Sequence, residues 1–421
     1  MEAHRMAAVD AQFYWMSAKI PNDEFLLYAF DGEPSNCERA VEQVCRRARA
    51  CPDLTMRIQD RSSLTYPQWV PTALGLEQVV CHDLPDHSWR DCLAAVVALA
   101  DAQLDVRRMP WRLHVFTPVL GIPGVSGTGA VVVMQVAHAL ADGARASAMA
   151  AWLLGRAAPV PPPARPSAGV FPWRAVDAAR THRRRVRDTR AGLLAPTLGD
   201  RPPQPTNARP DGVRSMRTLV RRRAQLRSPT ITVGVLTAVS TALSRLLGDA
   251  ADSLGAEVPM AKPGVPQANN HFGNVVVGLY PKLGLDERAE RIAIDLANGR
   301  RRFEHPATRA ADRALAAVRG APALGHLTVR SRCPGGAGGQ QHRGVECQSW
   351  SRRPELRGCS RGADGRVPGA VADDGPDSRG ARHRRHRCHQ RARRGIGRPR
   401  YRRVLAATRR GAMKPTVRQR I

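Results

Sequence analysis

Residues 129–153 read GAVVVMQVAHALADGARASAMAAWL, and they decide the fold of the N-terminal part of the chain. The apolar run 130–136 is typical of a buried strand, and the Ala-rich run that follows is typical of a helix. Between the two stand His138, Asp142 and Gly143. A neutral imidazole at the end of a buried strand is suited to act as a general base near pH 7. The same spacing fits a purely structural role, in which His138 is a hydrogen-bonded core residue and Asp142 caps the helix.

The pair Asp142-Gly143 also favours a tight turn, because glycine allows backbone freedom and an aspartate can bond back to its own turn. The carboxylate of Asp142 could instead pair with an arginine. In either case it would fix the loop that carries His138.

Residues 1–155 have the pattern of an α/β domain. Hydrophobic periodicity predicts strands at 25–30 and 111–119 and helices at 36–50 and 88–104. The strand 111–119 is expected to lie beside 130–136.

The Pro- and Arg-rich segment 156–212 is predicted to be a linker or surface crossover, with one basic helix at 175–194. Residues 213–330 then form a partial second domain. A helix is expected at 230–247, one clear strand at 272–279 and a further helix at 286–304.

The charge of the chain is concentrated at its C-terminal end. The formal net charge is +30, and residues 331–421 contribute +18 of it. Taken as a whole, such a charge predicts a protein that binds nucleic acid or an anionic membrane surface. The apolar content of 43% instead predicts a globular body for the rest of the chain.

The nine cysteines have no paired spacing. The cluster His383, His386, Cys388 and His389 lies in an Arg-saturated stretch that would repel a cation, so no metal site is predicted. No apolar run approaches the roughly 20 residues of a membrane span. The odd cysteine count and the lack of a signal peptide predict a cytoplasmic protein.

The composition of residues 331–421 indicates a shifted reading frame in a GC-rich gene. With permitted codons and a shift of one base, residues 381–393 yield HGIGDTVAISVHA. The same shift permits SPMMGLTHGV from residue 371 onward and GNSTVVSSVNRG from residues 339–350. These strings alternate like strands, whereas the written tail is Arg-rich and is predicted to be disordered. The slip is expected between residues 324 and 338. The alternative is a genuine basic tail.

Several stretches together resemble the bacterial wax ester synthase/diacylglycerol acyltransferase family, within the CoA-dependent acyltransferase superfamily. The block around His138 resembles its His-His-x-x-x-Asp-Gly motif. AVDAQFYWMS (8–17) looks like its N-terminal strand-and-turn, MPWRLHV (109–115) like its Pro-Leu-Trp segment and NNHFGNVVVGLYP (269–281) like its Gly-Asn strand. The three recovered strings also resemble the last segments of the family in the correct order.

The sequence departs from the family pattern at two places. Ala137 stands where the family has the first histidine of the pair, although His138 keeps the catalytic place. Gly234-Val235 stands where the family has an Asn-Asp pair in a helix of the second domain. The second departure weakens the expectation of full activity.

The resemblance implies an α/β (α+β) fold of two similar domains, with mixed sheets flanked by helices and with the second domain incomplete. It implies an acyl-CoA-dependent O-acyltransferase that makes triacylglycerol or wax ester from diacylglycerol or a long-chain alcohol. His138 would be the base, with Asp142 and Gly143 structural. Acyl-CoA would be a substrate, with no permanently bound cofactor. The expected substrate channel is lined by Trp111, His114, Asn270, Gly273 and Asn274, with Asn274 as a candidate oxyanion donor.

Alternatives remain open at this point. Trp111 and His114 also fit as ordinary core residues of a strand. The basic run THRRRVR (181–187) is typical of a solvated helix face, and contact with CoA phosphates or with a membrane or lipid-droplet surface is the sharper interpretation. The whole chain could be an inactive lipid-associated homologue, or a basic protein that binds nucleic acid or a membrane surface through its tail.

Overall fold

The computed structural model describes residues 2–62, 65–164, 171–199, 205–207, 212–226, 228–251 and 253–317. It also describes the short strands β10 (Val345–Cys347), β11 (Arg402–Arg403) and β12 (Val417–Gln419). The histidine and cysteine cluster at 383–389 lies outside the described residues, as does nearly all of the segment for which a frame shift is predicted. Both interpretations stay predictions.

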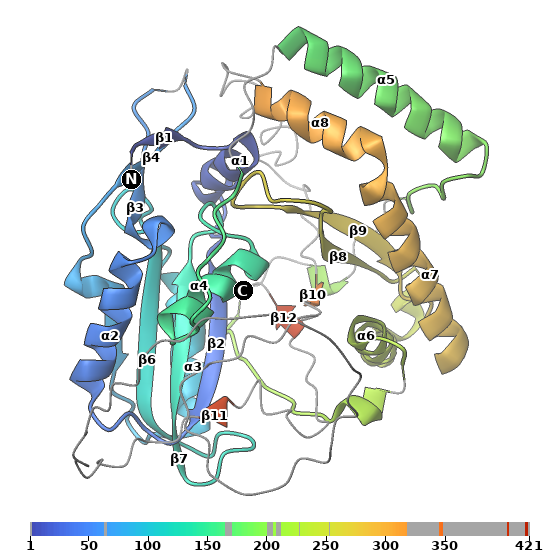
Figure 1. The fold of residues 1–421 in the computed structure, drawn as a ribbon. Coiled ribbons are helices and arrows are strands. Elements are labelled where there is room, and N and C mark those ends of the chain that lie inside the picture. The colour runs from blue at the N-terminus through green and yellow to red at the C-terminus, as the bar shows by residue number, and fades with distance from the viewer. Residues whose placement is uncertain are drawn as a thin grey trace, which may run out of the picture.

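A five-stranded sheet with the order β11-β2-β7-β6-β5 forms the centre of the N-terminal part (Figure 1). The strands β2 (Glu24–Asp31), β6 (Trp111–Leu120) and β7 (Thr128–Val136) pair antiparallel, and β5 (Val79–His82) runs parallel to β6. Every residue of β7 after Thr128 is buried, which explains why its sequence is apolar apart from Gln135, whose side chain is hydrogen-bonded. The predicted pairing of 111–119 with 130–136 is confirmed.

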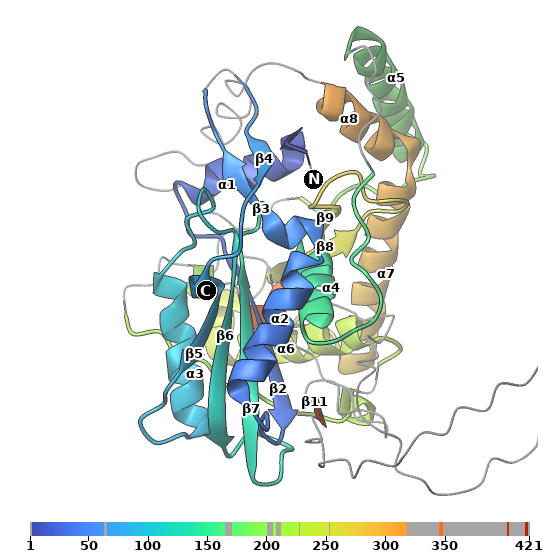
Figure 2. The same ribbon diagram turned by 60° about the vertical axis from the view of Figure 1, so that its left-hand side comes forward.

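Helices cover both faces of this sheet (Figure 2). Side chains of α1 (Ala8–Ser17), α2 (Cys37–Arg49) and α4 (Gly143–Leu153) pack on one face, in a core that includes Tyr28 and Met134. Helix α3 (Trp89–Ala98) packs on the other face. A small antiparallel sheet of β1 (His4–Arg5), β4 (Gln68–Pro71) and β3 (Met56–Gln59) flanks them.

The segment 8–17 is a helix, so the strand-and-turn expected there is wrong. Its buried residues Ala8, Ala11 and Trp15 recur at helical spacing, which places them on one face. Asp10 lies in the first turn, where a negatively charged carboxylate stabilises the positive end of the helix dipole. The strand-and-turn was implied only by the resemblance to the family, whereas burial of one face of this segment against the sheet fits the helix.

The second part of the chain is a smaller α/β unit. Strand β8 (Gly255–Ala261) pairs antiparallel with β9 (Phe272–Gly278), and α6 (Ile231–Leu247) and α7 (Leu285–Glu304) pack on this pair. The sequence predicted the strand at 272–279 but no strand to pair with it. In the structure, β8 pairs with it. Pro259 and Glu257 had hidden β8, because both residue types are unfavourable in strands.

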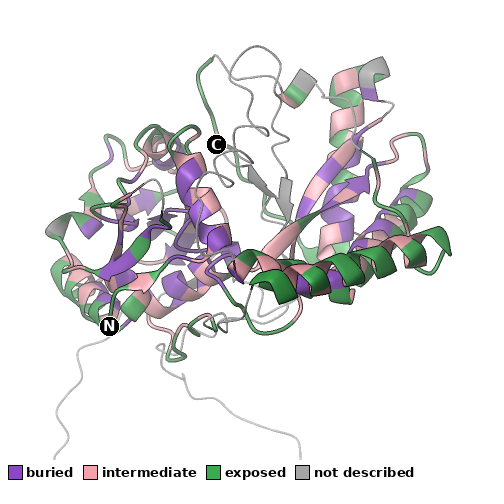
Figure 3. Ribbon diagram, turned by 90° about the horizontal axis from the view of Figure 1, so that it is seen from above, coloured by how far each residue is buried: buried purple, intermediate pink, exposed green. Residues whose placement is uncertain are grey.

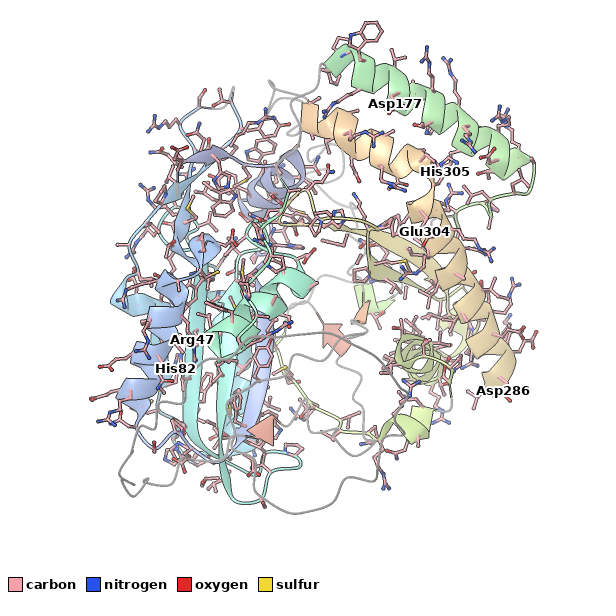
Figure 4. The ribbon with its side chains drawn as sticks, in the orientation of Figure 1. Arg47, His82, Asp177, Asp286, Glu304 and His305 are labelled. Atoms are coloured by element: carbon pink, nitrogen blue, oxygen red, sulfur yellow. The ribbon has the colours of Figure 1, made fainter. Side chains whose placement is uncertain are left out.

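Helix α5 (Phe171–Arg190) lies at the outer edge of the molecule beside α8 (Pro306–Ala317) (Figures 1 and 2). No residue of α5 is buried, and Figure 3 colours the ribbon by burial. The sequence had not predicted α8. Asp177 of α5 pairs with Arg313 at 2.9 Å, and His305 approaches Asp188 at 3.3 Å; Figure 4 labels Asp177 and His305. These contacts fix the crossover to the second unit. None of the helices in the described ranges has the length and apolar character needed to cross a membrane.

Candidate active site

His138 lies two residues beyond the end of β7, and its side chain has no exposed surface. The amide of the preceding Ala137 donates to the Pro110 carbonyl at 2.9 Å, which ties this turn to the start of β6. Because β7 is the buried central strand, the backbone that carries the imidazole is anchored in the core of the sheet.

Two aromatic rings from different parts of the chain contact the imidazole. Phe13 of α1 stacks on it at a centroid distance of 3.8 Å, and Phe272 of β9 lies 5.8 Å away with its plane inclined by 9°. Both rings exclude water from His138. The site therefore lies where the N-terminal part meets the second unit.

Glu24 brings a carboxyl group to the same imidazole. It is the first residue of β2, paired in register with Val136, and its Oε1 lies 3.6 Å from His138 Nδ1. The side chain is 2% exposed. Sequence reasoning missed this residue, although an acidic side chain opening the apolar strand EFLLYAF is the signal that could have identified it.

Asp142 connects the histidine loop to two other segments. Its Oδ1 accepts from the Arg145 amide at 2.9 Å, which makes Asp142 the N-cap of α4, and its Oδ2 accepts from the His271 amide at 2.9 Å. The predicted bonding back to its own turn is confirmed. The arginine that follows, Arg145, pairs with Asp53 at 2.7 Å instead. Gly143 is the first residue of α4 and is buried, and its predicted role in the turn stays a prediction.

Asp10 and Asn270 form a second connection. The Asp10 carboxyl accepts from the amides of Asn269 and Asn270 at 3.0 and 2.9 Å, and also from the Asn270 side chain at 2.9 Å. The Asn270 side chain donates in addition to the His138 carbonyl at 2.8 Å. The segment 269–271 therefore fixes the histidine loop through both backbone and side-chain groups.

Burial raises the pKa of Asp10 to about 7, and the hydrogen bonds from Asn270 and Asn269 oppose that rise. A buried carboxyl that titrates near neutrality is typical of functional sites, although structural networks produce it as well. Here the group contacts the second unit rather than a reacting atom.

A model of the wax ester synthase/diacylglycerol acyltransferase catalytic domain matches residues 6–269. The chain belongs to this family. It is accordingly an acyltransferase of the wax ester synthase/diacylglycerol acyltransferase type, and acyl-CoA is its acyl donor. None of the curated proteins compared with the chain matches it.

Solved structures share the fold. The first condensation domain of the calcium-dependent antibiotic synthetase, in complex with substrate analogue 2a, is 16% identical, with 85% of this chain and 83% of that chain covered and a TM-score of 0.51. The wax ester synthase/diacylglycerol acyltransferase from Marinobacter aquaeolei VT8 is 19% identical, with 75% and 78% covered and a TM-score of 0.46. The described strands and helices, together with the condensation-domain match, confirm the α/β architecture of mixed sheets with flanking helices that was expected from the sequence.

Residues 109–115, which resemble the family's Pro-Leu-Trp segment, lead into β6. Trp111 is fully buried, and its indole donates to the Leu54 carbonyl at 2.9 Å. His114 lies in a row of polar side chains with His82 at 2.9 Å and Gln135 at 3.1 Å. Burial lowers the pKa of His114 to about 4. Both residues occupy core positions, and the role in lining an acyl channel stays a prediction.

Residues 269–281, which resemble the family's Gly-Asn strand, include β9. A Cβ atom on Gly273 would lie 2.8 Å from Phe303 Cζ, so glycine here permits close packing of α7. Asn274 is exposed and donates to Glu257 at 3.2 Å. The role of Asn274 as an oxyanion donor stays a prediction.

Gly234 and Val235, which the resemblance aligns with the family's Asn-Asp pair, are buried in α6. A Cβ atom on Gly234 would lie 2.8 Å from Leu226 Cβ, so the backbone of α6 lies close to the segment before it. Among the described residues, no group of three or more His, Cys, Asp or Glu side chains is arranged to hold a metal ion.

Proposed function

We propose that this acyltransferase transfers the acyl group of acyl-CoA to the hydroxyl of diacylglycerol or of a long-chain alcohol, with His138 as the general base. The observation that carries the proposal is the setting of His138. Its imidazole is enclosed by Phe13 and Phe272, and its loop is fixed by Asp142 and Asn270. A base held this rigidly contributes about 10²–10⁴-fold to a rate.

In the proposed reaction His138 takes the proton of the acceptor hydroxyl while the oxygen attacks the thioester carbonyl. A C–O bond forms, and the C–S bond breaks. The imidazolium then returns the proton to the departing CoA thiolate. The proton taken from the hydroxyl ends on the thiolate, so the reaction balances without an oxidant or a metal. The residues of the chain supply only position and charge. Exclusion of water by the two phenylalanine rings suppresses hydrolysis of the thioester.

The acceptor lipids reside in membranes and lipid droplets, and α5 is suited to contact such a surface. Trp173 is 75% exposed, and the exposed residues Arg180, Arg183 and Arg187 continue at helical spacing from it. An aromatic residue followed by a basic stripe is typical of helices that lie on anionic lipid. We include peripheral contact through α5 in the proposed function.

The test is transfer from oleoyl-CoA or palmitoyl-CoA to dioleoylglycerol or hexadecanol, measured as the lipid product. His138→Ala should lower kcat at least a hundredfold and leave Tm within about 2 °C of wild type. His4→Ala, in strand β1 of the flanking sheet, is the matched control and should retain full rate. A loss below tenfold in His138→Ala would remove His138 from the reaction.

Gly234 and Val235 support a second candidate, a homologue that retains the fold and acyl-CoA binding without turnover. The absence of the Asn-Asp pair from α6 favours it. A folded wild-type protein that binds palmitoyl-CoA in equilibrium dialysis, yet forms no lipid product with any of these acceptors, would support this candidate over the enzyme.

A further inference from the structure

Glu24 and His138 form a pair that the family's motif does not contain. Their side chains are 2% and 0% exposed, and Oε1 lies 3.6 Å from Nδ1. Carboxylates are rarely buried unless they face a partner, because removing the charge from water is costly. The register of β2 on β7 places Glu24 opposite Val136, at the end of the sheet from which His138 projects.

Other carboxyl groups around the histidine loop have different partners. Asp142 accepts from the amides of Arg145 and His271, and Asp10 accepts from Asn269 and Asn270. Asp23, the neighbour of Glu24, accepts from the Leu104 amide and from Gln135, whose side chain belongs to the polar row with His114. Among the described ion pairs, Glu24 is the acid at the imidazole of His138.

We propose that Glu24 is the positioning residue of the reaction, which orients the imidazole of His138 and selects its reactive tautomer. This inference rests on the proposed role of His138 as the base. A carboxylate that accepts Nδ1–H leaves the lone pair on Nε2, which is the form of the ring that can accept a proton from a hydroxyl. The tautomer of a histidine is set by the hydrogen bond made by its other nitrogen.

The same carboxylate stabilises the charge that develops during the reaction. When Nε2 takes the hydroxyl proton, the ring becomes an imidazolium and Glu24 lies beside the new positive charge. The attraction is strong because Phe13 and Phe272 keep water away from the pair. The separation of 3.6 Å exceeds a hydrogen bond, and catalytic contacts of this kind tighten when substrate binds.

Substitution of Glu24 tests the two effects separately. Glu24→Gln keeps an acceptor for Nδ1–H but removes the charge, whereas Glu24→Met removes both at similar volume. We expect kcat to fall at least tenfold in Glu24→Gln and at least a hundredfold in Glu24→Met, with KM for palmitoyl-CoA changed less than threefold. Asp31→Asn, which alters a carboxyl at the opposite end of β2, is the matched control and should keep the wild-type rate.

Two further measurements distinguish this inference from failure of the proposed function. If His138 is the base, Glu24→Met should lower the residual rate of His138→Ala by less than twofold, since the pair acts as a unit. A fully active His138→Ala would refute the proposed function. A hundredfold loss in His138→Ala together with an unaffected Glu24→Met would refute the role of Glu24 alone.

Nitrogen-15 NMR of histidine-labelled protein reads the tautomer without turnover. The His138 signals are identified by their absence from His138→Ala. We expect the Nδ1–H form in wild type and in Glu24→Gln, and a shift toward the Nε2–H form in Glu24→Met. An unchanged Nδ1–H spectrum in folded Glu24→Met would overturn the inference.

Discussion

Asn270 donates its side-chain amide to the backbone carbonyl of His138 over 2.8 Å, from a position 132 residues further along the chain. The same amide donates to Asp10 at 2.9 Å. A single side chain thus connects helix α1, the histidine loop and the segment that leads into β9. The orientation of the proposed base therefore depends on the second unit as well as on the sheet that carries it.

Replacement of Asn270 should disturb both the fold and the reaction. Asn270→Ala removes two donated hydrogen bonds at a buried position and leaves their acceptors without these donors, at a cost of about 1–3 kcal/mol in unfolding free energy. We expect kcat to fall more than tenfold as the histidine loop loosens. Asn298→Ala is the matched control, because this half-buried residue of α7 has no part in the proposed site, and it should change either quantity little. Equal effects of the two variants would contradict the role of Asn270.

Asp142 should contribute chiefly to stability. Asp142→Ala removes the N-cap of α4 and the acceptor for the His271 amide, so we expect a loss of about 1–2 kcal/mol in unfolding free energy. Asp142→Asn keeps one side-chain oxygen for the cap and should lose less. Chemical denaturation monitored by circular dichroism measures both. A fully stable Asp142→Ala with a greatly reduced rate would instead indicate that Asp142 takes part in the chemistry.

Close packing of α7 on β9 gives a prediction about glycine. A Cβ atom on Gly299 would lie 2.3 Å from Val275 Cγ1 and 3.0 Å from its Cβ, and a β-branched side chain has little freedom to move away. Gly299→Ala should destabilise the protein by about 1–3 kcal/mol. The matched control is Gly284→Ala at the start of α7, where a Cβ atom would meet nothing within 4 Å. Similar melting temperatures for the two variants would show that α7 does not lie this close to β9.

Local sequence predicted the elements whose residues carry a strong period of their own. The strand before His138 and the strand at 272–278 are apolar and rich in valine, and α6 is bounded by Thr230, which caps it through the Val233 amide. The positions of His138 and of Asp142, which caps α4, were predicted from the strand and the helix on either side of them. Strand β8 was missed because Pro259 and Glu257 weaken its pattern, and α1 was misassigned because the resemblance of residues 8–17 to the family's N-terminal segment implied a strand and turn.

The partners of His138 were beyond local sequence reasoning. Glu24, Phe13 and Phe272 reach the imidazole from three separate elements, and only strand register and helix packing determine that they meet. The same holds for Asp10, because the amides of Asn269 and Asn270 that donate to its carboxyl group lie 259 and 260 residues away in the chain.

The frame shift predicted for the C-terminal segment is independent of the fold, and sequencing the gene across the codons for residues 324–338 tests it directly.

The titration of Asp10 predicts how stability changes with pH. Its pKa is raised from 3.8 to about 7 in the folded protein, so the folded state binds its proton more tightly than the unfolded state. The resulting stabilisation is fully present below pH 4 and is lost as the pH rises through 7, with a slope of at most about 1.4 kcal/mol per pH unit.

The titration of His114 changes the stability in the opposite direction. Its pKa is lowered to about 4, so its contribution is present above pH 6.5 and is lost as the pH falls.

Because these two titrations partly cancel in wild type, the prediction concerns the difference between wild type and Asp10→Asn. The difference in unfolding free energy should be largest in favour of wild type near pH 4 and should decline steadily toward pH 8. Arg145 is the cation whose charge acts on Asp10, and its favourable interaction with the ionised carboxyl limits the decline. Urea unfolding of both proteins across this range measures the difference. If it stays constant with pH, then Asp10 keeps its proton affinity on unfolding, and the connection that it makes with Asn269 and Asn270 is not the buried one described.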